Sequence, residues 1–191
     1  AMIPPKGTDY PPDNEHKKAL KRMTPEQTEA WHAAYDDQVQ KYYDFMNSDE
    51  AEDPVKLQRF KYQTMAKSYL RCIAAVDENI GRLLQWLEEN ELEKDTIVIY
   101  SSDQSYYIGE HGMADKRWMY EESLRMPLVI RWPGKIKPGT EVNEMVQNID
   151  YAPTLLSAAG LEVPAAMQGE SMLPLINGDT DGWRDSIYYH Y

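Results

Sequence analysis

The segment from Ser101 to Lys116, SSDQSYYIGEHGMADK, places several chemically versatile side chains close together. Asp103 and Gln104 offer a carboxylate and an amide carbonyl, which are oxygen ligands suited to a hard cation such as calcium. Calcium takes about six to eight oxygens, so this pair would form only part of a shell. Lys116 carries a compact positive charge that suits one oxygen of a sulfate or phosphate. His111 has the chemistry to donate a hydrogen bond to a substrate or to transfer a proton.

Each of these residues also has an ordinary structural explanation. Asp103 can cap a turn, and Gln104 and Lys116 belong to types that are common on protein surfaces. His111, between a glutamate and a glycine, can anchor a loop instead of taking part in chemistry. The spacing of the residues therefore leaves both interpretations open.

Apolar runs predict the strands that would position this segment. Residues 96–100 end immediately before it and are typical of a buried strand, as are residues 127–132. We predict a third strand at residues 145–149 and a further one at the tail, residues 187–191.

The first helix has a clear predicted start. Thr24 is a suitable N-cap, Pro25 suits the first helical position, and Gln27 completes a capping box. We expect this helix to run to about Tyr43. The acidic residues 47–54 that follow predict a solvent-exposed loop.

Two further helices are predicted. Intervals of three and four residues place one apolar stripe against a core, formed by Tyr69, Cys72, Ile73, Val76, Ile80, Leu83, Leu84 and Leu87. Within that stripe we expect Cys72 to be a packed, unreactive thiol. Asp150 is expected to cap a short helix that runs through Ala159 and stops at Gly160.

Strands that alternate with helices predict an α/β fold with a largely parallel central sheet flanked by helices. Ligands of such sheets gather beyond the carboxyl ends of the strands, and Asp103 has that position after residues 96–100. We expect a helical and loop region at residues 1–62 and a sheet-and-helix region at residues 63–191.

The composition limits the classes of function. The chain has 191 residues, which suits one domain or a substantial piece of a larger one. A net charge of −12 argues against a general nucleic-acid-binding protein. Residues 116–137 are locally basic, which indicates either a solvated face or a positive cleft for an anion. A single cysteine excludes an internal disulfide, and we expect neither a membrane span nor a signal peptide in the chain.

Several ordered motifs resemble one enzyme family. Residues 96–134, TIVIYSSDQSYYIGEHGMADKRWMYEESLRMPLVIRWPG, are similar to the C-terminal signature of the type I sulfatases, members of the alkaline phosphatase superfamily. Residues 148–191 resemble the segment that follows in that family, from Ile-Asp-x-x-Pro-Thr through Gln-Gly-x-Ser-x-x-Pro-Leu. The resemblance covers nearly the whole chain and implies an alkaline-phosphatase-like sandwich.

The resemblance also implies roles for individual residues. It makes Asp103 and Gln104 ligands of calcium, and Lys116 a contact to the sulfate group. His111 would contact the substrate or hold its loop, and Arg125 would position the loop or add positive potential. Ser105 stands where the family usually has glycine, and a positive φ there would strain it by roughly 1 kcal/mol.

One family motif has no counterpart here. Type I sulfatases use a Cys/Ser-x-Pro/Ala-x-Arg motif that matures to formylglycine, whose hydrate is the nucleophile, whereas Cys72 is followed by Ile-Ala-Ala-Val. We therefore expect the nucleophile on a missing N-terminal half of the same protein, and no turnover by this chain alone. The expected whole is a calcium-dependent, periplasmic or secreted bacterial sulfatase acting on a sulfated carbohydrate. The alternatives are a phosphodiesterase or phosphonate hydrolase of the same superfamily, and a non-catalytic remnant or binding module.

Overall fold

The computed structural model describes residues 21–190. They fall into two compact units, one ending at Asp77 and one beginning at Glu78, and each is described by itself. The division that the sequence predicts, between residues 62 and 63, stays a prediction. Every helix within the described residues is either too short or too polar to serve as a membrane span.

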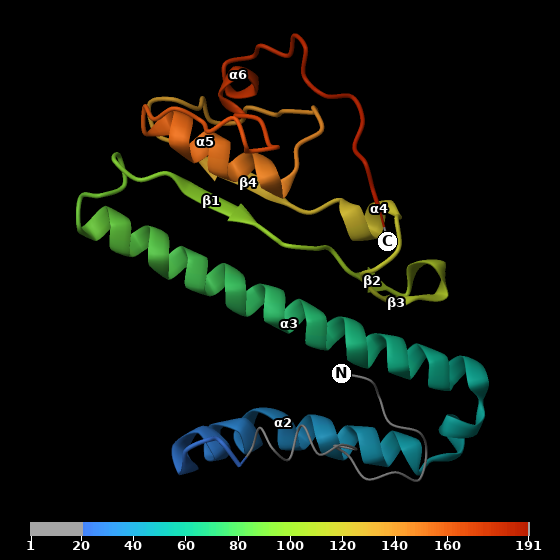
Figure 1. Ribbon diagram of the computed structural model, residues 1–191. Helices are drawn as coiled ribbons and strands as arrows, with labels where there is room; N and C mark the ends of the chain where they lie inside the picture. Colours follow the sequence, from blue (N-terminus) through green and yellow to red (C-terminus); the bar gives the residue numbers. More distant parts are fainter. Residues whose placement is uncertain (1–20, 191) are drawn as a thin grey trace. The chain divides into compact units, whose positions relative to one another are not determined.

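Helix α2, Pro25–Met46 (Figure 1), begins with the capping box that the sequence predicts. The Thr24 hydroxyl accepts a hydrogen bond from the Gln27 N–H at 3.3 Å. The Gln27 side chain in turn accepts one from the Thr24 N–H at 2.9 Å. Both bonds satisfy backbone donors that the first helical turn leaves without partners. The helix continues past the expected end at Tyr43 because Met46 packs into a buried position.

Replacing Thr24 with alanine is expected to fray the start of α2. Loss of an N-cap hydroxyl costs about 1 kcal/mol, which corresponds to an about fivefold larger equilibrium constant for opening of the first turn. Hydrogen-exchange mass spectrometry of peptides that cover residues 24–30 measures this directly. Thr24→Ser keeps the hydroxyl and should exchange like the parent, whereas equal protection in the alanine variant would refute the role of the cap.

The first unit buries a small aromatic contact between its two helices. Helix α3, Pro54–Glu89, follows the short 3-10 helix η1, Asp49–Glu52, so the predicted acidic loop is partly helical. Asp53 starts α3, because its carboxylate accepts a hydrogen bond from the Val55 N–H at 2.8 Å. Phe45 of α2 stacks on Phe60 of α3 with ring centroids 3.9 Å apart.

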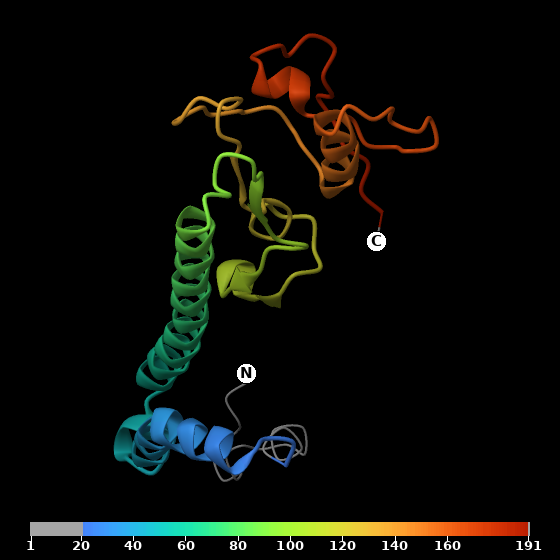
Figure 2. The ribbon, with the colours of Figure 1, turned by 90° about the vertical axis from the view of Figure 1, so that its left-hand side faces the viewer.

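The apolar stripe of α3 is mostly exposed, contrary to expectation. The helix is continuous over its whole length (Figure 2). Leu87 is its only buried residue among those described, while Ile73 and Val76 are 47% and 46% exposed. Cys72 is exposed too, so its prediction as a packed thiol is wrong for the described structure. The physical reason is that no described residue covers this part of the helix.

The second unit contains two antiparallel strand pairs. Strand β1, Val98–Ser101, pairs with β4, Leu128–Arg131, and Ser101 lies opposite Leu128. Strand β2, Tyr107–Ile108, pairs with β3, Ala114–Asp115. Both predicted strands are therefore confirmed, but none of their residues is buried, so the predicted burial is wrong for the described structure. Neither described pair is parallel, so the largely parallel sheet is not seen in residues 21–190 and stays a prediction.

The two other predicted strands are wrong. Residues 145–149 lead into the 3-10 helix η3, Asn148–Asp150, because the Asp150 carboxylate accepts the Gln147 N–H and turns the chain. Residues 187–190 form no strand, and residue 191 lies outside the described residues. The Tyr189 hydroxyl instead donates a hydrogen bond to the Arg117 carbonyl at 2.7 Å.

Helix α5, Tyr151–Ala158, ends at Gly160 as predicted, since glycine readily adopts the positive φ of 72° found there. Asp150 precedes α5 but does not cap it with its side chain, which corrects that prediction. The Asp150 carboxylate instead accepts hydrogen bonds from Gln147, Glu170 and Arg184.

Gly169 lies so close to Ile149 that an added Cβ would sit 2.0 Å from its carbonyl oxygen. Helix α6, Leu173–Ile176, follows and contributes the buried Leu175.

Candidate active site

A loop and a hairpin bring the predicted site residues together. The loop that leaves β1 carries Asp103 and Gln104, and the β2–β3 hairpin returns the chain to Lys116 (Figure 1). The Lys116 ammonium lies 3.9 Å from the Asp103 carboxylate, and both side chains are solvent-accessible, at 46% and 88%. The predicted anion-binding residue and the predicted metal ligand therefore lie close together on one surface. This proximity is the central geometric feature of the site.

The orientation of the Gln104 amide follows from its neighbours. Its Nε2 donates hydrogen bonds to the Lys116 carbonyl at 2.6 Å and to the Ser123 hydroxyl at 3.0 Å. A flipped amide would set Oε1 against the Lys116 carbonyl, and two acceptors cannot bond. The amide oxygen accepts no hydrogen bond from residues 21–190, as far as their described contacts go.

The donor set fits a hard cation in part. The Asp103 carboxylate and the Gln104 Oε1 are the oxygen types that calcium prefers. Within residues 21–190, no group of three or more His, Cys, Asp or Glu side chains is arranged to hold a metal. The pair therefore offers the kind of partial shell that the sequence predicts, and its role as a metal site stays a prediction.

His111 contacts helix α4, Glu121–Leu124, and the residue before it. His111 belongs to the 3-10 turn η2, Glu110–Gly112, and has a positive φ of 56°. Its Nε2 lies 3.0 Å from the Glu122 carboxylate, and its ring stacks on Tyr120 with centroids 4.1 Å apart. The backbone N–H of Glu122 and then the hydrogen bond with His111 lower the pKa of the Glu122 carboxyl. These contacts suit a residue that anchors the hairpin turn, and the substrate-side role of His111 stays a prediction.

Two other sequence predictions concern Arg125 and Ser105. Arg125 follows α4 and is exposed, and no described contact joins its side chain to Asp103 or Lys116. Its role stays a prediction. Ser105 is not among the described non-glycine residues that have a positive φ. The strain that a positive φ would cause at Ser105 is therefore absent from this structure.

Sequence reasoning missed a buried ion pair in the second unit. Asp150 is fully buried, and its carboxylate accepts hydrogen bonds from both Nη atoms of Arg184 in a bidentate pair. The Glu170 N–H donates to the same carboxylate at 2.9 Å. Burial, the largest single influence, raises the pKa of Asp150, but the hydrogen bonds together outweigh it and the net pKa is lowered. Nothing in the local pattern signals this pair, because Arg184 lies 34 residues away.

Ser123 was also missed. It lies in α4 and is 1% exposed. The Ser123 hydroxyl donates to the Lys116 carbonyl at 2.7 Å. Its backbone carbonyl accepts the Ser105 N–H at 3.2 Å. A serine in a polar stretch gives no signal of such contacts, because hairpin and helix must first fold together.

Comparison with known proteins agrees on one family. Residues 109–191 match the family model described as N-sulphoglucosamine sulphohydrolase, C-terminal. An N-acetylglucosamine-6-O-sulfatase of Bacteroides thetaiotaomicron is 44% identical over 181 residues, which cover 93% of this chain and 32% of the relative.

Solved structures give the same picture. A protein in complex with its substrate, D-glucosamine-2-N,6-O-disulfate, has a TM-score of 0.81 and 43% identity, covering 93% of this chain and 36% of its own. A phosphonate monoester hydrolase from Silicibacter pomeroyi has a TM-score of 0.62 and 34% identity, covering 65% of this chain and 24% of its own. The chain spans about a third of the length of the sulfatase relative and of the substrate complex. The chain belongs to the sulfatase family of the alkaline phosphatase superfamily, and its residues 109–191 match the C-terminal model of that family.

Proposed function

We propose that this chain is part of a calcium-dependent sulfatase that removes sulfate from a sulfated glucosamine unit of a glycan. The observation that carries the proposal is the meeting of Asp103, Gln104 and Lys116 on one surface, with Lys116 3.9 Å from Asp103. Support for the substrate comes from the similar protein whose complex holds D-glucosamine-2-N,6-O-disulfate. Because the chain spans about a third of its relatives, the activity belongs to the whole protein.

In this proposal, some residues hold the cation and another binds the sulfate ester directly. Asp103 and the Gln104 Oε1 would hold calcium, which when bound supplies positive charge to the sulfate oxygens. Lys116 would bind a nonbridging oxygen, where negative charge grows during attack on sulfur. A fixed positive charge at that point favours the transition state over the ground state. Arg125 adds positive potential nearby, and His111 holds the turn or meets the sugar.

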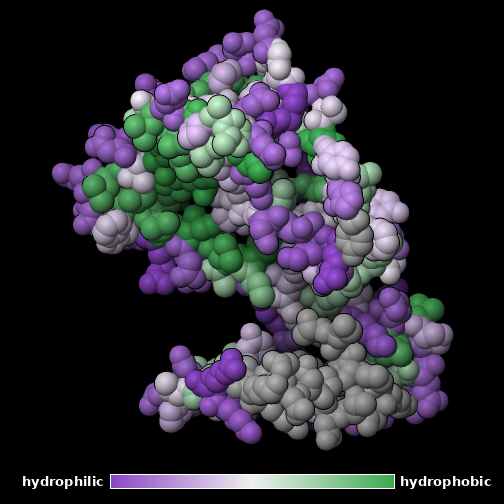
Figure 3. Space-filling view, viewed as in Figure 1, coloured by the Kyte–Doolittle hydropathy of each residue, from purple (hydrophilic) through white to green (hydrophobic). Residues whose placement is uncertain are grey.

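The nucleophile belongs, in this proposal, to an N-terminal part of the same protein. A formylglycine there would supply the nucleophile in its hydrated form, and this chain alone would not turn over sulfate esters. The same part would cover exposed apolar side chains of the second unit, including Tyr100, Val129 and Leu155, 40%, 61% and 47% exposed. Apolar residues gather on the face over β1 and α5 (Figure 3). Further strands beside β1 and β4 would complete a largely parallel sheet, and the family resemblance favours a periplasmic or secreted location.

One experiment separates this proposal from its alternatives. The intact protein that carries this chain is assayed for sulfate release from glucosamine-6-O-sulfate and, in parallel, for hydrolysis of a phosphonate monoester and a phosphodiester. We expect sulfate release to be faster by at least about a hundredfold, or roughly 2.7 kcal/mol in transition-state binding. A preference for the phosphorus esters would support the hydrolase alternative, which the likeness to a phosphonate monoester hydrolase favours. Calcium binding without any turnover would point to a non-catalytic binding module.

A further inference from the structure

We propose that Ser123 is a positioning residue for the cation site, although it touches neither the cation nor the substrate. This inference rests on the proposed function, because it concerns how Gln104 is held for calcium. Its basis is a closed set of hydrogen bonds that joins the Gln104 amide, the Ser123 hydroxyl and the Lys116 carbonyl.

The hydrogen atoms in this set are fully assigned by the chemistry of its members. A serine hydroxyl has one hydrogen to donate, and Ser123 uses it on the Lys116 carbonyl at 2.7 Å. The same oxygen must then accept from Gln104, whose Nε2 lies 3.0 Å away. The second amide hydrogen of Gln104 goes to the Lys116 carbonyl at 2.6 Å. Both amide hydrogens are thereby committed, and Oε1 is the group left to face a cation.

Burial makes the arrangement dependent on this one hydroxyl. Ser123 is 1% exposed, so water has little room to replace a lost hydroxyl. Its backbone carbonyl also fixes the residue after Gln104, because it accepts the Ser105 N–H at 3.2 Å. Ser123 therefore links the loop that carries the cation ligands to the backbone of Lys116, the anion-binding residue. Groups that orient metal ligands in this way typically change metal affinity by about 10–100-fold when removed.

The test measures calcium affinity and not turnover. The intact protein is stripped of divalent ions, and calcium is titrated by calorimetry into the parent and into Ser123→Ala. We expect the calcium Kd to rise about tenfold in Ser123→Ala, because the Gln104 amide loses its hydroxyl acceptor at 3.0 Å and keeps only the Lys116 carbonyl at 2.6 Å and the Ser123 carbonyl at 3.5 Å. Ser123→Cys, which keeps the volume but hydrogen-bonds weakly, should raise the Kd in the same direction and guards against misfolding of the alanine variant.

Thr154→Val is the matched control. The Thr154 hydroxyl is also buried, donates to the Asp150 carbonyl at 2.6 Å and accepts the Met172 N–H at 2.9 Å. Its removal should lower thermal stability and leave the calcium Kd unchanged. A purely structural Ser123 would behave in the same way, with lower stability and an unaltered Kd.

The outcomes separate this inference from the proposed function. Calcium binding that is lost in Asp103→Ala but unaltered in Ser123→Ala and Ser123→Cys would overturn the positioning role and leave the cation site intact. A parent protein that binds no calcium would overturn the cation site and this inference with it. A raised Kd in both Ser123 variants, with Thr154→Val unaffected, is the result that supports the inference.

Discussion

Replacing Lys116 with alanine in the intact protein is expected to lower kcat/KM for a sulfated glucosamine by about a hundredfold to a thousandfold. A charge aimed at the developing negative charge of a transition state contributes roughly that much in other enzymes. Lys116 is suited to the role because its side chain is 46% exposed and its ammonium lies 3.9 Å from the Asp103 carboxylate. The measurement is initial-rate sulfate release at several substrate concentrations, so that kcat and KM are obtained separately.

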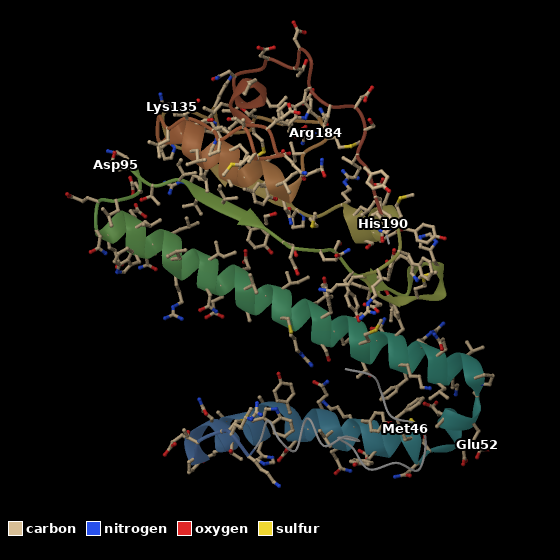
Figure 4. The ribbon with its side chains drawn as sticks, viewed as in Figure 1. Met46, Glu52, Asp95, Lys135, Arg184 and His190 are labelled. Atoms are coloured by element: carbon tan, nitrogen blue, oxygen red, sulfur yellow. The ribbon has the colours of Figure 1, made fainter. Side chains whose placement is uncertain are left out.

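The control is Lys135→Ala, which removes the same charge from an exposed loop that follows β4 (Figure 4). If the general basic character of residues 116–137 mattered, both variants would lose activity to a similar extent. We expect Lys135→Ala to retain nearly full activity. Retention of more than about half the activity in Lys116→Ala would show that its charge does not act on the reacting sulfate.

The contact between Lys116 and Asp103 has a further consequence for this site. An exposed pair of this kind contributes at most about 1 kcal/mol to stability and is screened by salt. The pair is therefore weak enough to separate when stronger partners arrive. A calcium ion on Asp103 and a sulfate on Lys116 would replace the contact with two better-matched ones, so the pairing does not obstruct the proposed site.

Local rules predicted part of the fold, including the strand that leads into the site. The capping box at Thr24 needs only neighbouring residues, and the structure confirms it. The apolar runs that became β1 and β4 were long enough to signal strands before their pairing was known. The proximity of Asp103 and Lys116 also agrees with the sequence prediction, because a loop and a short hairpin separate them. Their chemical roles stay predictions.

Contacts between distant segments account for what the sequence did not predict. Residues 145–149 have strand-like composition, but the Asp150 carboxylate bends them into η3. Cys72 lies on an apolar stripe whose covering partner is not among the described residues. Glu122 becomes the partner of His111 only when α4 folds against the hairpin turn. The spacing of residues along the sequence does not predict such contacts between distant segments.

Replacing Arg184 with alanine is expected to destabilise the second unit by about 3–5 kcal/mol, because it leaves the buried Asp150 carboxylate without its charged partner. Asp150 is fully buried, and the Arg184 side chain is only 12% exposed, so solvent screens the pair weakly. Scanning calorimetry of the intact protein at pH 7 measures the effect. Arg131→Ala, which removes an exposed arginine from β4, should cost less than about 1 kcal/mol. Similar losses in the two variants would contradict the role of the buried pair.

The same pair predicts how stability depends on pH. The pKa of Asp150 is lowered in the folded protein, so its contribution is fully present above the unfolded value of about 3.9. That contribution is lost as the pH falls through the lower, folded pKa, because the unfolded state then binds no more protons than the folded one. The difference in melting temperature between the parent and Arg184→Ala should therefore be largest near pH 7 and shrink in strong acid. A difference that stays constant with pH would mean that Arg184 acts mainly through its packing on the Trp183 ring, 4.8 Å away, and not through its charge.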